Sequence, residues 1–478
     1  MRYQITNKDK RKMFLKKIWI LLGITISGNS QAQEILPFKL EKEWSCYASN
    51  DVYKITKPEK ITTAPDTLHN IKRQKVVLKN GFCKQEKHFL LINEFHSDKE
   101  GIMYIRAGAE HVQLQLLING KNLVDLYSSF LYNRLGLPGS HDIALPVKKG
   151  KNILILRTPR GTCYIGASSK ENYLATHPSR NNFAAIQYSA AGTRQRDIEE
   201  MLVRNGVDNM SSIVFKKFRY DHKISGKKLE KLYDKYPVLE FYDQSLLKIL
   251  KEIQETTVNN GAVAWLVYNM GYVIKTPESC FGIDIYHRLA EKLVPYLDFA
   301  LVSHKHADHF DPYFCKAMEA AGKPVITNFL PENNAVNPPA NRTIKDIKLE
   351  FQATDHNKKL LNFVMCSRIT CGRGKDAPVI YHTGDSCNPE QLKPSGRIDI
   401  HILHPRVGLS VPQAARLLKP GAIWFSHLLE MGHCQPCPWR PIEYAESHQD
   451  AEIIKQRGDN ISFRFPLWGE KIVIPPVK

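Results

Sequence analysis

The chain has 478 residues, which is too long for one ordinary hydrophobic core, so two or three domains are expected. A hydrophobic content of 43% and an aromatic content of 10% are typical of a globular protein and exclude a disordered one. The formal net charge of +19 favours acidic partners such as phosphate esters, uronic acids or anionic lipid head groups. An evenly spread basic surface explains the charge equally well. No basic run with interleaved aromatic residues predicts binding to nucleic acid.

Residues 1–32 have the order of a secretory signal peptide. Lys and Arg residues between positions 8 and 17 precede an apolar stretch at 18–26, and Ser30-Gln31-Ala32 is typical of a cleavage site. The apolar stretch is short for a membrane span, so an uncleaved anchor is the weaker alternative. We therefore expect a periplasmic or secreted protein with no transmembrane span after cleavage.

Ten cysteines in an exported chain permit disulfides, but the sequence does not give their connectivity. Cys366 and Cys371 flank a predicted turn. Cys434 and Cys437 are the closest pair, for which a local disulfide or two free thiols are the main alternatives. Zinc ligation by this pair is a third alternative, which lacks a second pair to complete four ligands.

The pattern of residues 35–175 predicts a β-sandwich. Turn residues separate short apolar or alternating runs at 76–78, 89–92, 101–105, 112–118 and 153–156. The turn Ile118-Asn119-Gly120-Lys121 and the later run from Lys149 to Leu154 resemble galactose-binding-like jelly rolls of bacterial glycan enzymes. The resemblance implies a module that packs against a catalytic domain or contacts sugar, and packing is the better supported of the two.

Residues 176–256 predict a charged helical connector, with helical periodicity at 194–203 and 246–253. From 257 to 478 the pattern changes to α/β. The expected elements there are a hairpin at 262–267 and 271–275, a strand at 281–285, a helix at 286–293, a strand at 297–302, a helix at 311–321 and a strand at 324–327.

A run of metal-ligand side chains follows the strand predicted at 297–302. His304, His306, Asp308 and His309 lie within six residues, in a chain that has only 18 histidines. Imidazole nitrogen and carboxylate oxygen suit zinc and similar divalent ions. A histidine-rich surface loop is the alternative, and the spacing favours the metal site.

Three further candidates follow predicted strands. His356 comes after 347–351, Asp385 after 379–380, and His427 directly after the apolar Trp424-Phe425. Gly384 allows the backbone to turn tightly before Asp385. Active sites of layered α/β folds often lie where strands leave the sheet, so these side chains are candidates for the same site.

The order H-x-H-x-D-H, then His, then Gly-Asp, then His resembles the metallo-β-lactamase superfamily over residues 261–477. The run His382-Thr383-Gly384-Asp385-Ser386 looks more like the branch containing ascorbate-phosphate lactonase and N-acyl-phosphatidylethanolamine phospholipase D. The resemblance implies an αββα sandwich that binds two divalent metal ions, zinc first, with manganese or iron as alternatives.

The resemblance also implies the role of each ligand. His304, His306 and His356 would bind the first ion, Asp308, His309 and His427 the second, and Asp385 would bridge the two. Asp308, Asp385 and His433 are the candidate catalytic residues. His433 would contact substrate or stabilise a leaving group, and a structural or surface histidine is an equal alternative.

Four other residues have weaker assignments. His382 is a candidate for supporting the ligands, and Asp284 for hydrogen-bonding the ligand loop. His404 and Arg406 lie on a predicted loop, where Arg406 would bind an anionic group or form a surface salt bridge.

The sequence therefore predicts an exported, multidomain metal-dependent hydrolase in which a metal-bound hydroxide attacks the substrate. The favoured substrate is a phosphodiester, in a phospholipase D-like reaction, or a sugar phosphate. Lactone or ester hydrolysis is the first alternative. A non-catalytic glycan-binding or surface protein with a structural metal site is the second. The expected partner is an anionic small molecule, glycan or lipid derivative, and the sequence leaves the oligomeric state open.

Overall fold

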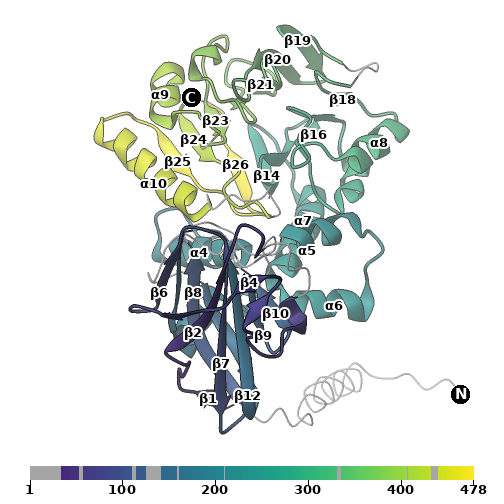
Figure 1. Ribbon diagram of the computed structural model, residues 1–478. Coiled ribbons are helices and arrows are strands. Elements are labelled where there is room, and N and C mark those ends of the chain that lie inside the picture. The colour runs from purple at the N-terminus through teal and green to yellow at the C-terminus, as the bar shows by residue number, and fades with distance from the viewer. Residues whose placement is uncertain are drawn as a thin grey trace, which may run out of the picture.

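The computed structural model describes residues 34–52, 58–109, 115–124, 141–158, 161–208, 210, 212–330, 335–405, 407–431 and 440–477. The predictions for the signal segment, Arg406, His433 and the Cys434–Cys437 pair lie outside these residues. Figure 1 shows N-terminal sheets, a group of helices and C-terminal sheets along the molecule.

Two β-sheets enclose the N-terminal core. A six-stranded sheet has the order β10-β9-β12-β7-β2-β5, and a five-stranded sheet has the order β1-β8-β13-β6 with β11 paired to β8. A short ribbon of β3 and β4 lies beside them. The strands are β1 Ile35–Leu36, β2 Glu43–Ala48, β3 Thr67–Leu68, β4 Ile71–Lys72, β5 Gln74–Val77, β6 Phe82–Gln85, β7 Phe89–Ser97, β8 Gly101–Ala109, β9 Gln115–Ile118, β10 Lys121–Val124, β11 His141–Val147, β12 Gly150–Thr158 and β13 Gly161–Ala167.

The apolar run at the start of β7 is explained by burial on both faces. Successive strand residues point to opposite sides of a sheet. Phe89 and Leu91 pack in the core between the two sheets, whereas Leu90 and Ile92 pack in a second cluster on the other face. A strand covered on both faces has no need of polar alternation, so its sequence is continuously apolar.

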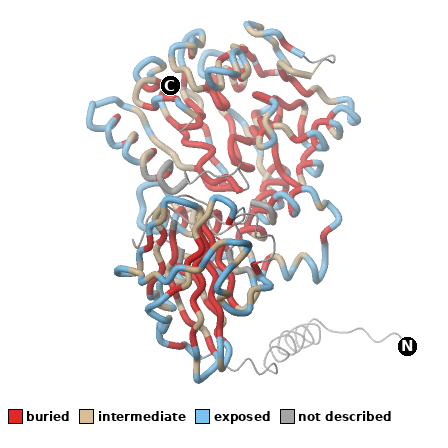
Figure 2. Tube along the Cα trace, viewed as in Figure 1, coloured by how far each residue is buried: buried red, intermediate tan, exposed pale blue. Residues whose placement is uncertain are grey.

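The helices that follow share a hydrophobic core with the C-terminal sheets. One cluster of buried side chains extends from Phe183 to Ile474, and Figure 2 shows the buried residues continuing through both parts. The helices are α2 Lys170–Thr176, α3 Arg180–Ala184, α4 Arg194–Asp208, α5 Ser212–Tyr220, α6 Gly226–Lys235 and α7 Pro237–Glu255. In α7 the buried residues Leu239, Tyr242, Leu246 and Ile249 recur at helical spacing and form its apolar face.

The C-terminal part contains a six-stranded sheet, β18-β17-β16-β15-β14-β26, and a seven-stranded sheet, β19-β20-β21-β22-β23-β24-β25. Strands β22 to β25 are parallel, so their carboxyl ends share one edge. The strands are β14 Ala262–Tyr268, β15 Gly271–Lys275, β16 Cys280–Ile283, β17 Phe299–Leu301, β18 Val325–Ile326, β19 Ala340–Ile344, β20 Ile347–Thr354, β21 Val364–Cys371, β22 Val379–His382, β23 Ile400–Leu403, β24 Ala422–Phe425, β25 Ser462–Arg464 and β26 Lys471–Ile474. The helices are α8 Pro312–Ala320, α9 Val411–Leu418 and α10 Arg440–Gln456.

The helix predicted at 286–293 is wrong. Residues 286–287 are irregular, 288–289 form a turn, and a 3-10 helix, η3, follows at Ala290–Tyr296. Pro295 lies inside η3 and lacks the N–H that a longer α-helix would use. Buried polar contacts hold the turn, because Arg288 pairs with Asp243 and His287 Nε2 lies 3.1 Å from the Tyr242 carbonyl oxygen.

The turn predicted between Cys366 and Cys371 is also wrong. Both residues lie on β21, a regular strand of which every residue except Arg368 and Thr370 is buried. Five residues of strand span about 16 Å, far beyond the Cα separation that a disulfide allows. The eight cysteines that the structure describes are all free thiols.

No helix within the described ranges is long and apolar enough to cross a membrane.

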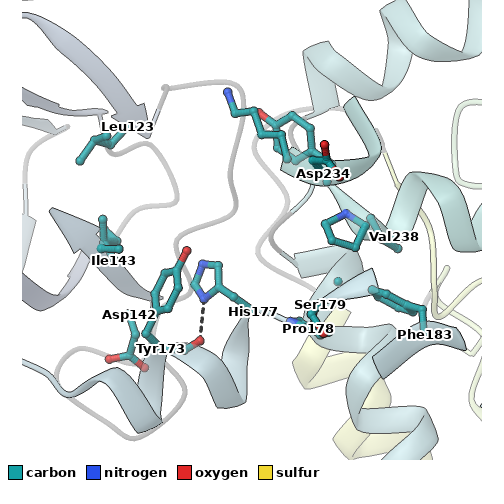
Figure 3. Close-up of a pocket in the computed structure, with 15 residues that line it drawn as sticks. Leu123, Asp142, Ile143, Tyr173, His177, Pro178, Ser179, Phe183, Asp234 and Val238 are labelled. Carbon is teal, nitrogen blue, oxygen red and sulfur yellow. Dashed lines mark hydrogen bonds between the residues drawn. The ribbon is translucent and has the colours of Figure 1, made fainter. Parts of the chain in front are cut away.

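A cavity of about 420 Å³ lies between the N-terminal sheets and the helices (Figure 3). Its lining includes Leu123, Asp142, Tyr173, His177, Asp234 and Tyr236. The His177 ring stacks on Tyr173 at 4.0 Å, and Asp142 is already held by Arg106 at 2.9 Å. None of the predicted metal ligands lines this cavity.

A buried ion pair connects the helices to the start of α8. Arg219 on α5 pairs with Asp311, and their side chains are 0% and 1% exposed. Asp311 also caps α8, because its Oδ1 accepts the backbone N–H of Tyr313 at 3.0 Å. Burial raises the pKa of Asp311 above its ordinary value, and the charge of Arg219 limits that rise. Since Asp311 follows His309 by two residues, the pair fixes one end of the histidine-rich loop.

Replacing Arg219 by Met should lower the free energy of unfolding by about 3–5 kcal/mol, because Asp311 is left buried without its partner. The double variant R219M/D311N should recover much of the loss, since an amide carries no charge and still caps the helix. Urea unfolding of the metal-free full chain measures both. The control is Arg373→Met in the pair with Glu278, which is 70% and 48% exposed and should leave the midpoint unchanged. Equal losses in R219M and R373M would contradict the prediction.

Candidate metal centre

The structure brings the seven predicted metal ligands together in two groups. The first group is His304, His306, His356 and Asp385, and the second is Asp308, His309, Asp385 and His427. Within each group, one ligand atom from every residue lies within 4.8 Å of the others. The ligands follow β17, β20, β22 and β24, so both C-terminal sheets contribute to the site.

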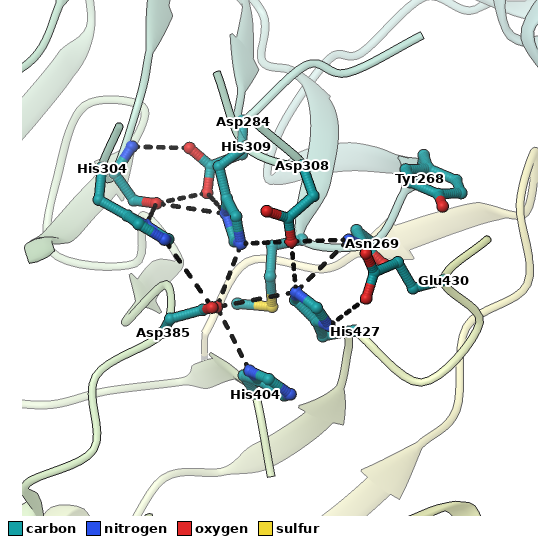
Figure 4. A network of polar contacts seen from close by, with 12 residues as sticks. Tyr268, Asn269, Asp284, His304, Asp308, His309, Asp385, His404, His427 and Glu430 are labelled. Atoms are coloured by element: carbon teal, nitrogen blue, oxygen red, sulfur yellow. Dashed lines mark hydrogen bonds and ion pairs between the residues drawn. The ribbon is translucent and has the colours of Figure 1, made fainter. Parts of the chain in front are cut away.

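Asp385 belongs to both groups, and its two oxygens divide between them. Oδ2 lies 3.8 Å from His304 Nε2 and 3.4 Å from His356 Nε2. Oδ1 lies 3.2 Å from His309 Nε2 and 3.9 Å from His427 Nε2, as Figure 4 shows for the second group. One carboxylate therefore faces both groups with one oxygen each.

These separations suit ligands of a common ion. Two ligands, each about 2.1 Å from a tetrahedral ion, lie roughly 3.4 Å apart. In the second group, Asp308 Oδ2 lies 2.9 Å from His427 Nε2 and 3.4 Å from His309 Nε2. The separations scatter around the expected value, so a divalent ion fits each group.

Unpaired buried atoms also indicate a cation. His304 Nε2, His309 Nε2 and Asp385 Oδ1 are buried and form no aligned hydrogen bond within the described residues, although His309 Nε2 and Asp385 Oδ1 lie 3.2 Å apart. A buried polar atom without a partner costs about 1–3 kcal/mol, and three such atoms converge here. A bound cation would satisfy all three, so the residues present fit a two-metal centre.

Carboxylates on the far side of two ligand rings fix their orientation. Asp284 Oδ2 lies 2.8 Å from His309 Nδ1, and Asp284 Oδ1 accepts the Ser303 N–H at 2.7 Å. Glu430 Oε2 lies 3.5 Å from His427 Nδ1. A proton held on Nδ1 leaves the Nε2 lone pair for a metal. Asp284 therefore bonds the ligand loop as its sequence position predicts.

Close backbone approach brings Asp385 beside the histidine loop. Gly384 has a φ of +47°, and a Cβ there would lie 2.8 Å from Ser303 Oγ. A larger residue would push Asp385 away from His304. Asp284 and His427 also have left-handed backbone, with φ of 44° and 65°. Such strain in non-glycine residues is concentrated at functional sites in proteins.

The charges at the site are strongly coupled. Burial alone would raise the pKa of Asp385, but His309, His404 and His427 bring it well below its ordinary value. Burial would lower the pKa of His309, but Asp385, Asp308 and Asp284 raise it well above its ordinary value. The carboxylates thus favour positive charge in this space, which a proton or a metal ion can supply.

The other histidines predicted near the site occupy distinct places. His404 is buried, stacks on His427 at 3.9 Å, and has Nδ1 3.3 Å from Asp385 Oδ1. His382 Nε2 lies 3.0 Å from the Met270 carbonyl oxygen and 3.8 Å from Asp284 Oδ2, so it contacts the carboxylate that supports the His309 ring. His433 and Arg406 lie outside the described residues.

Sequence reasoning missed Glu430 and Asn269. Glu430 follows His427 by three residues, and a carboxylate so close in sequence to a predicted ligand is a detectable signal. Asn269 Nδ2 lies 3.3 Å from Asp308 Oδ2, although Asn269 is 39 residues away in the chain. Its sequence context, Tyr268-Asn269-Met270-Gly271, indicates only a hairpin turn.

No protein-family model and no curated protein matches the sequence. Solved structures resemble parts of the chain. Igni18, a metallo hydrolase from Ignicoccus hospitalis, is 13% identical with a TM-score of 0.35, over 44% of this chain and 97% of its own. A Parabacteroides distasonis protein, assigned as a candidate metal-dependent hydrolase, is 17% identical with a TM-score of 0.33, over 44% and 97%. CmlA, a diiron β-hydroxylase from Streptomyces venezuelae, is 12% identical with a TM-score of 0.34, over 53% and 60%.

A buried neutral histidine lies behind the Asp385 loop. His401 on β23 is 0% exposed, and its Nε2 lies 3.2 Å from Thr383 Oγ1. Burial, with a smaller effect of His382, lowers the pKa of His401 to about 3. The folded chain therefore keeps His401 neutral at pH values where the unfolded chain protonates it.

The free energy of unfolding should fall as pH drops below about 6.5. The His401 side chain then binds a proton in the unfolded state but stays neutral when it is buried in the folded state. The loss approaches ~1.4 kcal/mol per pH unit until the folded pKa is reached. The variant His401→Gln should lose about 2 kcal/mol less than wild type between pH 6.5 and 5. Urea unfolding of both chains with a chelator present tests this, since metal release then adds nothing. Identical pH slopes would rule out His401 as the source.

Proposed function

We propose that the chain is an exported metal-dependent hydrolase that cleaves an anionic phosphodiester, in a phospholipase D-like reaction, or a sugar phosphate. We further propose a galactose-binding-like jelly roll at its N-terminus and a metallo-β-lactamase αββα sandwich at its C-terminus. The pairs of sheets in each part and the signal-like order of residues 1–32 support these assignments.

The observation that carries the proposal is the division of Asp385 between the two ligand groups. Two divalent ions bound there would lower the pKa of water and neutralise charge on an oxygen. The chain's part is to hold the ligands in place. Asp284 and Glu430 orient two histidine rings, and burial of His304 and His309 keeps bulk water from that side.

Exposed lysines beside the ligands favour an anionic substrate. Lys305 lies between the ligands His304 and His306, and Lys358 and Lys359 follow the ligand His356. All three lysines are exposed, and the His306 and His356 rings are 4.5 Å apart. The lysines therefore place positive charge on the two loops that carry the first ligand group, and positive charge attracts phosphate more than it attracts a neutral lactone.

The full chain, supplied with Mn²⁺ or Zn²⁺, should hydrolyse bis(p-nitrophenyl) phosphate. Removing a ligand in His304→Ala, or the shared charge in Asp385→Asn, should lower the rate by at least about 100-fold, since even loss of a hydrogen-bond partner of a ligand typically costs about 10–100-fold. Release of p-nitrophenol measures the rate. His96→Ala is the matched control, because His96 is 70% exposed and lies in the N-terminal part. Turnover of a simple lactone alone would replace the phosphodiesterase assignment by a lactonase.

Replacing Lys305, Lys358 and Lys359 together by Ala should raise KM for the phosphodiester and leave kcat nearly unchanged. Removal of three exposed charges weakens attraction of the anion but leaves the ligand groups intact. Steady-state kinetics at low and high salt measure this, and salt should reduce the difference between variant and wild type. An unchanged KM at low salt would contradict the proposed role of the lysines.

A further inference from the structure

Asn269 lies at the tip of the hairpin between β14 and β15, close to the second ligand group. Its backbone is left-handed, with a φ of 52°, and the residue is 2% exposed. The backbone carbonyl of Asn269 accepts the N–H of His427 at 3.2 Å. The backbone of the hairpin therefore contacts the backbone of His427 directly.

The side-chain amide of Asn269 faces the same group. Nδ2 lies 3.3 Å from Asp308 Oδ2 and 3.4 Å from His427 Nε2 (Figure 4). An amide oxygen in that place would face a carboxylate oxygen with no proton between them, so the contacts assign Nδ2 to this side. Among the described residues, Asn269 Oδ1 is buried without a hydrogen-bond partner, so the amide is held through Nδ2, which is nearest to Asp308 Oδ2.

We propose that Asn269 is a positioning residue for the second metal, a role that rests on the proposed two-metal function. Its Nδ2 donates to Asp308 Oδ2, and its carbonyl holds the backbone of His427. Asp308 needs such support because its side chain is 18% exposed, whereas His309 and His427 are nearly completely buried. Hydrogen bonds to ligating carboxylates typically contribute 10–100-fold to metal affinity.

If Asn269 only shapes the turn, its substitutions should have different effects from those expected if its amide positions Asp308. Asn is favoured at left-handed turns, so its replacement can act through the backbone alone. Asn269→Gly keeps the left-handed backbone and removes the amide. Asn269→Ala also removes the amide and strains the backbone. Asn80→Gly is the matched control, because Asn80 has a φ of 51° in the N-terminal part.

The test is calorimetric titration of the metal-free full chain with Zn²⁺ in two backgrounds. His356→Ala leaves the second group intact, and His427→Ala leaves the first. In His356→Ala, both Asn269 variants should weaken Zn²⁺ binding about 10–100-fold. In His427→Ala they should leave it unchanged, and Asn80→Gly should have no effect in either. Thermal unfolding of each metal-free chain confirms that the binding differences come from folded protein.

Three results would overturn the inference. If Asn269→Gly leaves the Zn²⁺ affinity unchanged in the His356→Ala background, the amide does not position Asp308. A loss in Asn269→Ala alone would assign the effect to the turn. Equal losses in both backgrounds would indicate general damage. A wild-type chain that binds no Zn²⁺ would instead overturn the two-metal function itself, so the two failures are distinguishable.

Discussion

The arrangement of the C-terminal part depends on one buried carboxylate that two groups of ligands share. Asp385 can direct one oxygen to each group because Gly384 packs directly against Ser303, the residue before His304. That contact joins the end of β22 in one sheet to the end of β17 in the other. Burial among histidines makes the carboxylate charge costly unless positive charge is present, so the sheets are held together around a place that favours cations.

Strained backbone supports this arrangement. Asn269, Asp284 and His427 each adopt left-handed φ without being glycine. Each costs of the order of 1 kcal/mol or more, and it persists because surrounding contacts over-determine it. All three residues make contacts within the site. The His427 N–H donates to the Asn269 carbonyl oxygen, and the Asp284 carboxylate bonds the His309 ring. Stability is thus lost where the ligands need fixed orientation.

The sequence predicted the strands that precede the ligands better than it predicted their surroundings. The H-x-H-x-D-H ligands are neighbours in the sequence. The apolar runs before His356, Asp385 and His427 mark strand ends, and in a layered α/β fold such ends lie near one another, so the sequence could predict that these side chains meet. Asn269 gave no chemical signal, because its contact with Asp308 depends on how two distant loops meet. The error at η3 has a local cause, since tertiary contacts of Arg288 and a mid-segment Pro295 override helical periodicity.

The helices before the C-terminal sheets help to fix the loops that carry the candidate metal ligands. Arg219 on α5 pairs with Asp311 across 92 residues, and Asp311 ends the loop that carries His309. Glu252 on α7 accepts the indole N–H of Trp265 on β14 at 2.8 Å, and β14 leads directly to Asn269. Two supports of the second ligand group are therefore fixed from the helical segment. A change in the packing of those helices can shift Asp308 and His309 without altering any ligand, because close-packed interiors transmit small displacements.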